Sequence, residues 1–255
     1  MYQQERCIKI LEHLNNSKHL SVHDICEIFD ISRDTARRDI VRLVEEGTVV
    51  RTHGGITLPG YDETIHSYRE RLEAHSQEKK EMAEKALTFI KDEEHYFLDV
   101  STTISYLAGI LNSKVSIFTH SLDNLEILSG NQKVTVYSVG GFLNKENRFF
   151  YSFDYSNSLE RVHFDTSFFG AAAICEDGFY YKDYEDAIIK NTASKQADKV
   201  IVLAGFEKFG RTSYYKGLSW EQINILITDK LPPALYMDLI IKHNIELHIV
   251  GRGRN

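Results

Sequence analysis

The sequence predicts two domains of different class, a small α+β domain followed by a larger α/β domain whose sheet is mostly parallel. Two observations indicate this division. The first 58 residues combine helical hydrophobic spacing with two short β-branched runs, and Pro59 and Gly60 then interrupt the pattern. The rest of the chain alternates apolar runs of strand length with helical segments. A chain of 255 residues is long enough for one small and one larger domain.

Three helices are expected before Gly47. The first covers residues 2–16, the second follows Ser21 as its N-cap, and the third follows Ser32, whose hydroxyl can accept a hydrogen bond from the first turn. Asp30 separates the second helix from the third, and Gly47 is a natural C-terminal stop. The apolar stripes expected to face the core are Ile8, Ile10, Leu11 and Leu14, then Val22, Ile25, Ile28 and Phe29, then Ala36, Ile40, Leu43 and Val44.

A β-hairpin and a linker complete the N-terminal part. Short strands are predicted over residues 48–51 and 56–58, with a turn at Gly54 and Gly55. Residues 59–75 are polar and charged and have no clear apolar stripe, so we expect a linker that becomes helical near its end. The linker therefore joins predicted domains over residues 1–58 and 76–255.

The larger domain is expected to begin with an amphipathic helix at Ser76. Continuous apolar strands separated by helices indicate a parallel sheet that is covered on both faces. The runs of this kind are HYFLDV, VSIFT, VTVYSVGG, HFDTSFFGAA, KVIVLAG, INILITD and IELHIVG. Pro232 and Pro233 are expected to start the last helix, where a missing N–H does little harm. The aromatic stretch over residues 148–155 fits either core packing or a subunit interface.

Composition argues against several kinds of site. Cys7, Cys26 and Cys175 are odd in number and form no CxxC pair, so neither a disulfide framework nor a zinc ribbon is expected. The histidines are scattered without a ligand set, and we expect neither a metal nor a cofactor. No apolar run approaches the roughly 18 residues of a membrane helix, and the start of the chain lacks the apolar core of a signal peptide. These features predict a cytoplasmic protein without membrane contact.

Basic side chains are concentrated in one short segment of a chain whose formal net charge is −7. If the apolar stripe of the third helix faces the core, Arg33, Arg37 and Arg38 must point elsewhere, near the end that a helix-turn-helix inserts into the major groove. Arginine can pair with guanine or phosphates, and a threonine hydroxyl with a base edge or a phosphate. The alternative is a solvated face that Asp34 and Asp39 partly neutralise. The expected DNA-contacting residues are Ser32, Arg33, Thr35, Arg37, Arg38 and Arg42, with Arg51, His53 and Gly54 on a wing beside them.

These residues resemble the signature of a known family. The pattern is Arg6, Ile10, Leu14, then Ser32-x-x-Thr35-Ala36-Arg37-Arg38-Asp39-Ile40, then Arg51-x-His53-Gly54-Gly55. It is similar to the N-terminal signature of DeoR-type transcriptional regulators at essentially every defining position. The resemblance implies a winged helix-turn-helix in which the helix from Arg33 to about Glu45 reads the groove. It also implies that Asp39 orients an adjacent arginine rather than contacting DNA.

Small, hydroxyl and glycine residues follow most of the predicted strands of the larger domain. In open α/β sheets, ligands bind beyond the carboxyl ends of the strands, where backbone N–H groups and helix N-termini can hold an anion. A phosphorylated ligand is therefore expected at this edge, with Lys208 supplying a cation. The alternative is that these residues are only helix caps and turns.

The resemblance to the DeoR family continues over the larger domain. It implies a sensor domain similar in fold to ribose-5-phosphate isomerase that senses a phosphorylated sugar or a related metabolite. Asp99-Val100-Ser101-Thr102-Thr103 resembles the family's Asp-Ser-Gly-Thr-Thr, Thr119-His120-Ser121 resembles Thr-Asn-Ser, and Asp186-Ala187 with Lys190 fits Glu-Ala-x-x-Lys. His120 either adds a pH-dependent charge or replaces the asparagine hydrogen bond. The expected effector-binding residues are Asp99, Ser101, Thr102, Thr103, Thr119, His120, Ser121, Gly140, Gly141, Lys190 and Lys208.

One segment departs strongly from the family's pattern. Gly205, Phe206 and Glu207 stand where the family has Asp-Ser-Ser, which removes one carboxylate and two hydroxyl donors. The departure implies an unusual effector or weaker binding of the usual one.

The expected function is a sequence-specific DNA-binding transcriptional regulator, a repressor of a carbohydrate operon controlled by a phosphorylated sugar. Because dimers bind operators of two-fold symmetry, a dimer or tetramer is expected. One alternative is a sugar-phosphate isomerase with an accessory N-terminal domain. Proton abstraction beside a carbonyl needs a positioned base, and residues 170–173 contain none, although Asp99 and Asp186 are nearby carboxylates. Another alternative is an adaptor that uses the winged domain for protein contacts.

Overall fold

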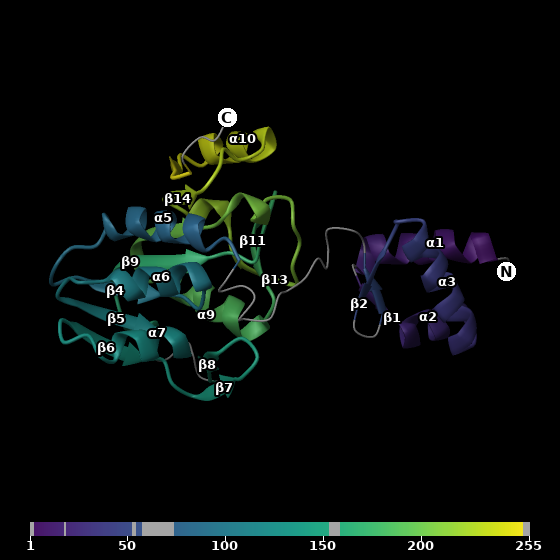
Figure 1. Ribbon diagram of the computed structural model, residues 1–255, viewed down its shortest axis with the longest axis horizontal. Helices are drawn as coiled ribbons and strands as arrows, with labels where there is room; N and C mark the ends of the chain where they lie inside the picture. Colours follow the sequence, from purple (N-terminus) through teal and green to yellow (C-terminus); the bar gives the residue numbers. More distant parts are fainter. Residues whose placement is uncertain (1–2, 18, 53–54, 58–73, 153–158, 252–255) are drawn as a thin grey trace. The chain divides into compact units, whose positions relative to one another are not determined.

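The computed structural model describes residues 3–17, 19–52, 55–57, 74–152 and 159–251. The chain divides into two compact units, Met1–Ile65 and His66–Asn255, and each is described by itself (Figure 1). The predicted linker over residues 59–75 lies almost wholly outside the described residues, so its limits and its helical end stay predictions. None of the helices in the described ranges is both long enough and apolar enough to cross a membrane.

The first unit contains the predicted helices and a small antiparallel sheet. Its elements are α1 (Gln3–Ser17), β1 (His19–Ser21), α2 (Val22–Phe29), α3 (Arg33–Glu45), β2 (Val50–Thr52) and β3 (Gly55–Thr57). The predicted hairpin is β2 paired with β3. β1 pairs with the other side of β3, so the strand order is β1-β3-β2. This first strand was not predicted, because three residues are too few to show a strand alternation.

Side-chain caps set the helix boundaries of the first unit. The Ser21 hydroxyl accepts a hydrogen bond from the N–H of Asp24 (3.0 Å), and the Asp24 carboxylate accepts one from the N–H of Ser21 (2.8 Å). The Ser32 hydroxyl caps α3 by accepting from the N–H of Thr35 at 3.2 Å. Asp30 ends α2 with a left-handed φ of 48°, and Gly47 follows α3 with a φ of 68°. The predicted caps and breaks are therefore confirmed.

The core of the first unit uses only part of each predicted stripe. Ile8, Ile28 and Val44 are exposed, so their predicted place in the core was wrong. Cys7 is buried instead of Ile8, because a neighbouring position is turned by about 100° around the helix axis. The buried residues of this core are Cys7, Ile10, Leu14, Leu20, Ile25, Ala36, Ile40, Leu43, Val49 and Ile56.

Close packing of β1 against β3 explains the glycine at position 55. A Cβ on Gly55 would lie 2.1 Å from the carbonyl oxygen of Leu20, so a side chain has no room there. Gly55 is the first residue of β3 rather than part of the predicted turn, and Gly54 lies outside the described residues. The unpredicted strand β1 thus explains why position 55 is a glycine.

The second unit is built around a seven-stranded sheet. All of its strand pairs are parallel, which confirms the predicted class. Each predicted apolar run forms one of its strands, which are β4 (His95–Leu98), β5 (Val115–Thr119), β6 (Val134–Ser138), β9 (Phe164–Gly170), β12 (Ala197–Leu203), β14 (Ile225–Thr228) and β15 (Glu246–Ile249).

Helices cover both faces of this sheet, as Figure 1 shows. One core packs α5, α6 and α7 against side chains such as Tyr96 and Leu98 of β4. The other core packs α9 and α10 against the opposite face, to which Phe97 of the same strand points. Pro233 is the N-cap of α10, close to the predicted start. The helices are α5 (Ser76–Leu87), α6 (Thr102–Ile110), α7 (Leu122–Leu128), α9 (Tyr184–Lys195) and α10 (Ala234–Lys242), with short 3-10 turns η1 (Phe206–Lys208) and η2 (Trp220–Gln222).

Two small antiparallel sheets were not predicted. The hairpin of β7 (Phe142–Asn144) and β8 (Phe149–Tyr151) contains part of the aromatic stretch, of which Phe149 is fully buried. The second small sheet has the order β10-β11-β13, formed by β10 (Ala173–Cys175), β11 (Gly178–Tyr181) and β13 (Tyr215–Leu218). Core packing thus accounts for Phe149, and an interface role for the rest of the stretch stays a prediction.

Candidate functional sites

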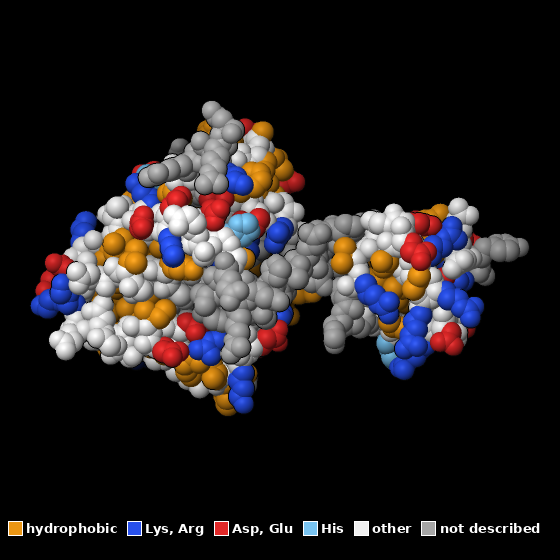
Figure 2. Space-filling view, viewed as in Figure 1, with side chains coloured by type: hydrophobic (Ala, Val, Ile, Leu, Met, Phe, Trp, Pro, Cys, Tyr) orange, Lys and Arg blue, Asp and Glu red, His pale blue; other side chains and the backbone are white. Residues whose placement is uncertain are grey.

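The outer face of α3 presents arginines, as predicted. Arg33, Arg37 and Arg38 are exposed, because Ala36, Ile40 and other buried positions turn the opposite side of the helix toward the core. Figure 2 shows Lys and Arg side chains gathered on this unit. Among the described residues, Arg37 pairs with Asp34 alone, at 4.0 Å. These guanidinium groups are therefore accessible to a partner, in a chain whose overall charge is acidic.

Other predicted DNA-contacting residues have local roles as well. Ser32 and Thr35 lie at the start of α3, where their hydroxyls are 3.0 Å apart. Arg42 is half-exposed and pairs with Glu46 one turn later, at 2.8 Å. Arg51 is exposed on β2, while His53 and Gly54 lie outside the described residues. The structure thus brings the residues of α3 to one face, and the contribution of the wing stays a prediction.

The arginine partner of Asp39 is Arg6. Its buried carboxylate pairs with Arg6 of α1, with Nε to Oδ2 at 2.5 Å and Nη2 to Oδ1 at 3.0 Å. Asp39 therefore does pair with an arginine, and this arginine lies on α1. Asp39 lies on the buried side of α3, and its side chain therefore points to α1 and not to the exposed arginines of α3.

The candidate effector site lies where the strand order of the large sheet reverses. From β4 the chain proceeds to β5 and β6 on one side, and then to β9, β12, β14 and β15 on the other. The carboxyl ends of β4 and β9 therefore mark the topological switch point, at which ligands bind in such sheets. Asp99 follows β4 there, and its Oδ2 accepts a hydrogen bond from the N–H of Gly170 at the end of β9 (2.7 Å).

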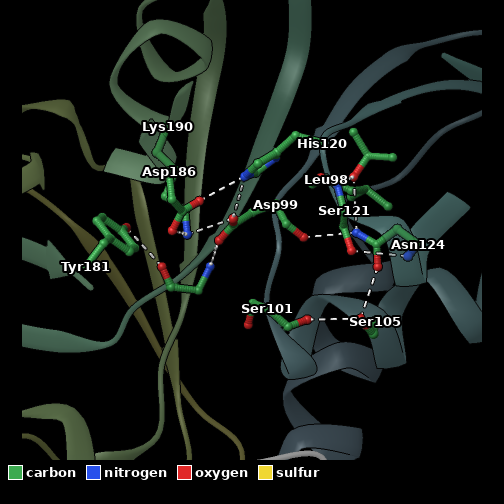
Figure 3. Close-up of polar contacts among 12 residues, drawn as sticks. Leu98, Asp99, Ser101, Ser105, His120, Ser121, Asn124, Tyr181, Asp186 and Lys190 are labelled. Carbon is green, nitrogen blue, oxygen red and sulfur yellow. Dashed lines mark hydrogen bonds and ion pairs between the residues drawn. The ribbon is translucent and has the colours of Figure 1, made fainter. Parts of the chain in front are cut away.

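Four ionisable side chains meet at this point (Figure 3). The ammonium of Lys190 on α9 lies 2.8 Å from Oδ1 of Asp99 and 2.9 Å from Oδ2 of Asp186, one turn earlier on the same helix. His120, which follows β5, places Nε2 at 2.8 Å from Oδ1 of Asp186. All four are buried. We call Asp99, His120, Asp186 and Lys190 the buried quartet.

The pKa shifts in the buried quartet are consistent with a charged Lys190. Burial opposes its ammonium, but the carboxylates of Asp186 and Asp99 keep the pKa of Lys190 above its ordinary value. Burial alone would raise the pKa of Asp186, yet Lys190 and His120 hold it below its ordinary value. For Asp99, burial raises the pKa more than Lys190 lowers it. Lys190 therefore acts as a fixed cation between two carboxyl groups.

Tyr181 closes one side of the buried quartet. Its ring lies 3.9 Å from the ammonium of Lys190, and its hydroxyl donates to the carbonyl of Gly170 at 3.0 Å. Burial, and next the carboxylates of Asp99 and Asp186, raise the pKa of this phenol well above its ordinary value. It is therefore a neutral donor. Sequence reasoning missed Tyr181, because β11 belongs to a small sheet that the hydrophobic pattern did not reveal.

The histidine in the quartet revises the expectation that no histidine has potential metal-ligand partners. Donor atoms of Asp99, His120 and Asp186 lie within 4.8 Å of one another, a spacing that could hold a metal ion. The ammonium of Lys190 already contacts both carboxylates, so an ion at that position would have to displace it. Nδ1 of His120 is buried without a hydrogen-bond partner among the described residues.

Several predicted effector residues hold the segments that follow β4 and β5 by hydrogen bonds to the backbone. Ser101 caps α6 and Ser121 caps α7 by accepting from backbone N–H groups. The hydroxyl of Thr119 donates to the carbonyl of Leu98 at 2.6 Å. Asn124 of α7 donates to the carbonyl of Asp99 at 2.9 Å and so connects α7 to the end of β4. Asn124 was missed because it lies inside a helix, three positions after its cap.

The remaining predicted residues lie further along the same sheet edge. Thr102 and Thr103 form the first turn of α6. Gly140 and Gly141 follow β6, both with positive φ, and a Cβ on Gly141 would lie 2.2 Å from the carbonyl oxygen of Tyr151. Lys208 lies on η1 after β12, with its ammonium 3.5 Å from Oε1 of Glu207.

The segment that departs from the family's pattern has a structural reason for its glycine. A Cβ on Gly205 would lie 2.2 Å from Oε2 of Glu207, because that carboxylate folds back over the backbone of Gly205. The N–H of Phe206 donates to Asp229 at 2.6 Å. A carboxylate thus remains beside position 205, although it comes from a residue two positions later.

Comparison with known proteins finds similarity to transcriptional regulators over nearly the whole chain. The family model described as the DeoR-like helix-turn-helix domain matches residues 6–60, and the DeoR C terminal sensor domain matches residues 74–230. The HTH-type transcriptional repressor GlcR of Bacillus subtilis is 37% identical over 248 residues, which cover 97% of this chain and 96% of that protein. The glycerol-3-phosphate regulon repressor of Escherichia coli is 25% identical over 252 residues, covering 98% and 100% respectively.

A solved structure shows a weaker likeness. Ribose 5-phosphate isomerase A of Methanocaldococcus jannaschii covers 53% of this chain and 55% of its own, with 14% identity and a TM-score of 0.39. The family assignment depends instead on the matched domains and on the identity with a full-length relative. This chain belongs to the DeoR family of helix-turn-helix transcriptional regulators.

Proposed function

We propose that this DeoR-family regulator represses a carbohydrate operon by binding operator DNA and that a phosphorylated sugar controls it. The observation that carries the DNA-binding part is the exposed arginine face of α3 in a chain of net charge −7. Similar proteins include a repressor, GlcR, and a glycerol-3-phosphate regulon repressor. Such a protein would act in the cytoplasm, where its DNA is.

The DNA contact would use the N-terminal half of α3. This half carries Arg33, Arg37 and Arg38 on its exposed side, and in a helix-turn-helix that end meets the base edges. Arginines that neutralise phosphates release counterions, so each such contact steepens the fall of affinity with salt. Arg51 on β2 would contact the backbone beside the groove.

The effector would bind at the carboxyl edge of the large sheet, beside the switch point between β4 and β9. Its phosphate would lie near the start of α6 at Thr102 and Thr103, because a helix N-terminus favours an anion. Asp99 is fully buried beneath this edge, and it would act through the backbone of Gly170, whose N–H donates to its Oδ2 at 2.7 Å. Lys208 on η1 would supply a further cation from the neighbouring strand end.

Effector and operator binding would be coupled through a homo-oligomer, a dimer or a tetramer. Two copies of α3 would meet two half-sites of an operator with two-fold symmetry. The effector changes operator affinity only by as much as it discriminates between the two states of the protein, which is typically about 5- to 150-fold.

The proposal is tested by operator binding in the presence of candidate effectors. An operator is first selected by the wild-type protein from a random duplex pool, and its affinity is then measured by fluorescence anisotropy with phosphorylated sugars and with their unphosphorylated counterparts. We expect a phosphorylated sugar alone to shift the affinity. If no duplex is selected, DNA binding is refuted. If an operator is selected but unphosphorylated sugars act equally well, only the phosphate assignment fails.

We further propose that the chain is not an isomerase. The carboxylates of Asp99 and Asp186 are both engaged by Lys190, and Asp186 also by His120, so neither is placed as an unpaired base. The run of residues 170–173 supplies no other base. Incubation of the protein with ribose 5-phosphate should give no ribulose 5-phosphate above the uncatalysed rate, and turnover by the purified chain would overturn this.

A further inference from the structure

A buried ion pair joins the first helix of the DNA-binding unit to the recognition helix. The Asp39 carboxylate of α3 accepts two hydrogen bonds from the Arg6 guanidinium, at 2.5 and 3.0 Å, and a third from the Gln3 side-chain amide at 3.0 Å. Asp39 has no exposed surface and Arg6 keeps 8%. All three donors come from α1, so this carboxylate connects α3 to a single neighbour.

The position of Asp39 on α3 determines where the exposed arginines of the same helix point. One residue corresponds to about 100° around a helix, so Arg38 points about 100° and Arg37 about 200° away from Asp39. When Asp39 faces α1, these two arginines must therefore point outward. A rotation of α3 by about 20° would move groups at its outer radius of about 5–6 Å by ~2 Å. A side chain that reads base edges must be held within about 0.5 Å.

The apolar contacts of α3 lack the directionality of this ion pair. Ala36, Ile40 and Leu43 pack against the core by non-directional burial, and Ala36 is small. A bidentate pair between a guanidinium and a carboxylate has a defined plane and direction. The carboxyl group also belongs to a helix that would face phosphates, and Arg6 neutralises its charge from the protein side.

We propose that Arg6 is a positioning residue for DNA recognition: through Asp39 it sets the rotation of α3 and hence the aim of Arg37 and Arg38. Arg6 itself is buried and contacts no DNA. The pair increases the affinity for the operator relative to random DNA. The general attraction to phosphates depends instead on the exposed arginines. This inference rests on the proposed DNA-binding function of α3.

The decisive variant replaces both partners by apolar residues, Arg6→Met with Asp39→Leu. Exchange of a buried ion pair for apolar side chains of similar size is often neutral or stabilising, so the fold is expected to survive. We expect the melting temperature to stay equal or rise, and binding to random duplex at low salt to stay within about 2-fold. Affinity for the selected operator should fall by at least 10-fold, so the ratio of operator to random-duplex affinity falls with it.

Two further variants keep the test decisive. Arg6→Lys retains the charge without the bidentate geometry and should lower the operator to random-duplex ratio while the fold persists. Lys9→Met removes an exposed pair with Glu5 on the same helix and should leave the ratio unchanged. An unchanged ratio in the double variant overturns the inference. If the double variant unfolds, an unchanged ratio in Arg6→Lys overturns it, and so does an equal loss of operator and random-duplex binding. Failure of the wild-type protein to bind any duplex would instead refute the proposed function.

Discussion

Removal of Lys190 tests the electrostatics of the buried quartet. Lys190→Met keeps a side chain of similar length but removes the cation that lies 2.8 Å from Asp99 and 2.9 Å from Asp186. Two buried carboxyl groups then lose their shared partner. Breaking a buried ion pair by removing one member costs about 3–5 kcal/mol, and Lys190 is only 2% exposed, so little solvent screening reduces this value.

This loss of unfolding free energy in Lys190→Met predicts a fall in melting temperature and the pH dependence of that fall. For a domain of this size, 1 kcal/mol corresponds to about 2–4 °C, so the melting temperature should fall by about 6–20 °C at pH 8. Without the ammonium, the pKa of both Asp99 and Asp186 must rise, because burial then dominates. Protonation removes the buried charge as the pH falls, so the difference from wild type should shrink toward pH 5. In the wild type, the lowered pKa of Asp186 gives stability that is present above its ordinary value of 3.8 and lost below it.

Thermal unfolding of the full chain at pH 8 and pH 5 measures these quantities. Lys195→Met is a matched control, since Lys195 is an exposed residue at the end of the same helix. We expect the control to melt like the wild type at both pH values. A Lys190→Met protein that melts within 2 °C of the wild type at pH 8, or whose deficit grows on acidification, would refute the reasoning.

The other predictions concern the arginine face, the wing and the sheet edge. Replacing both Arg37 and Arg38 with Ala should weaken operator binding and reduce the slope of log affinity against log salt by about 1–2, while the melting temperature stays the same; an unchanged slope in a salt series would reject the assignment. Gly55→Ala should destabilise the first unit by about 1–3 kcal/mol in thermal melts, because the added Cβ meets the Leu20 carbonyl. Gly109→Ala, where nothing lies within 4 Å, is its control and should cost nothing. Lys208→Ala should reduce the effector response in calorimetry without altering DNA binding in the absence of effector, and a normal response would remove Lys208 from the site.

Hydrophobic periodicity was enough to predict the long elements of this fold. Each apolar run of the second unit became a parallel strand, and the inner strands are apolar because both of their faces are covered. Ser21 and Ser32 identified helix starts, since a hydroxyl before an apolar stripe is a local signal. The short strands β1, β7, β8, β10, β11 and β13 were missed, because three or four residues are too few to show a strand alternation.

At the candidate sites too, the sequence did not predict contacts between residues that are far apart along the chain. Asp99 and His120 could be expected near each other, because both follow neighbouring parallel strands. Their contact with Lys190 and Asp186 depends on how α9 packs against the sheet, which residue spacing does not encode. The sequence did not show which arginine pairs with Asp39 for a similar reason, since 33 residues separate Asp39 from Arg6. Spacing thus indicated candidate residues on each strand end, but not which of these residues contact one another.

One titration asks whether the first unit binds DNA and whether the second unit controls that binding through a phosphorylated sugar. The affinity of the full-length protein for its selected operator is measured by anisotropy as a phosphorylated sugar panel is added at constant ionic strength. We expect at least a 5-fold change in operator affinity with a phosphorylated sugar and none with the same sugar lacking its phosphate. An operator affinity that stays constant across the whole panel would contradict it.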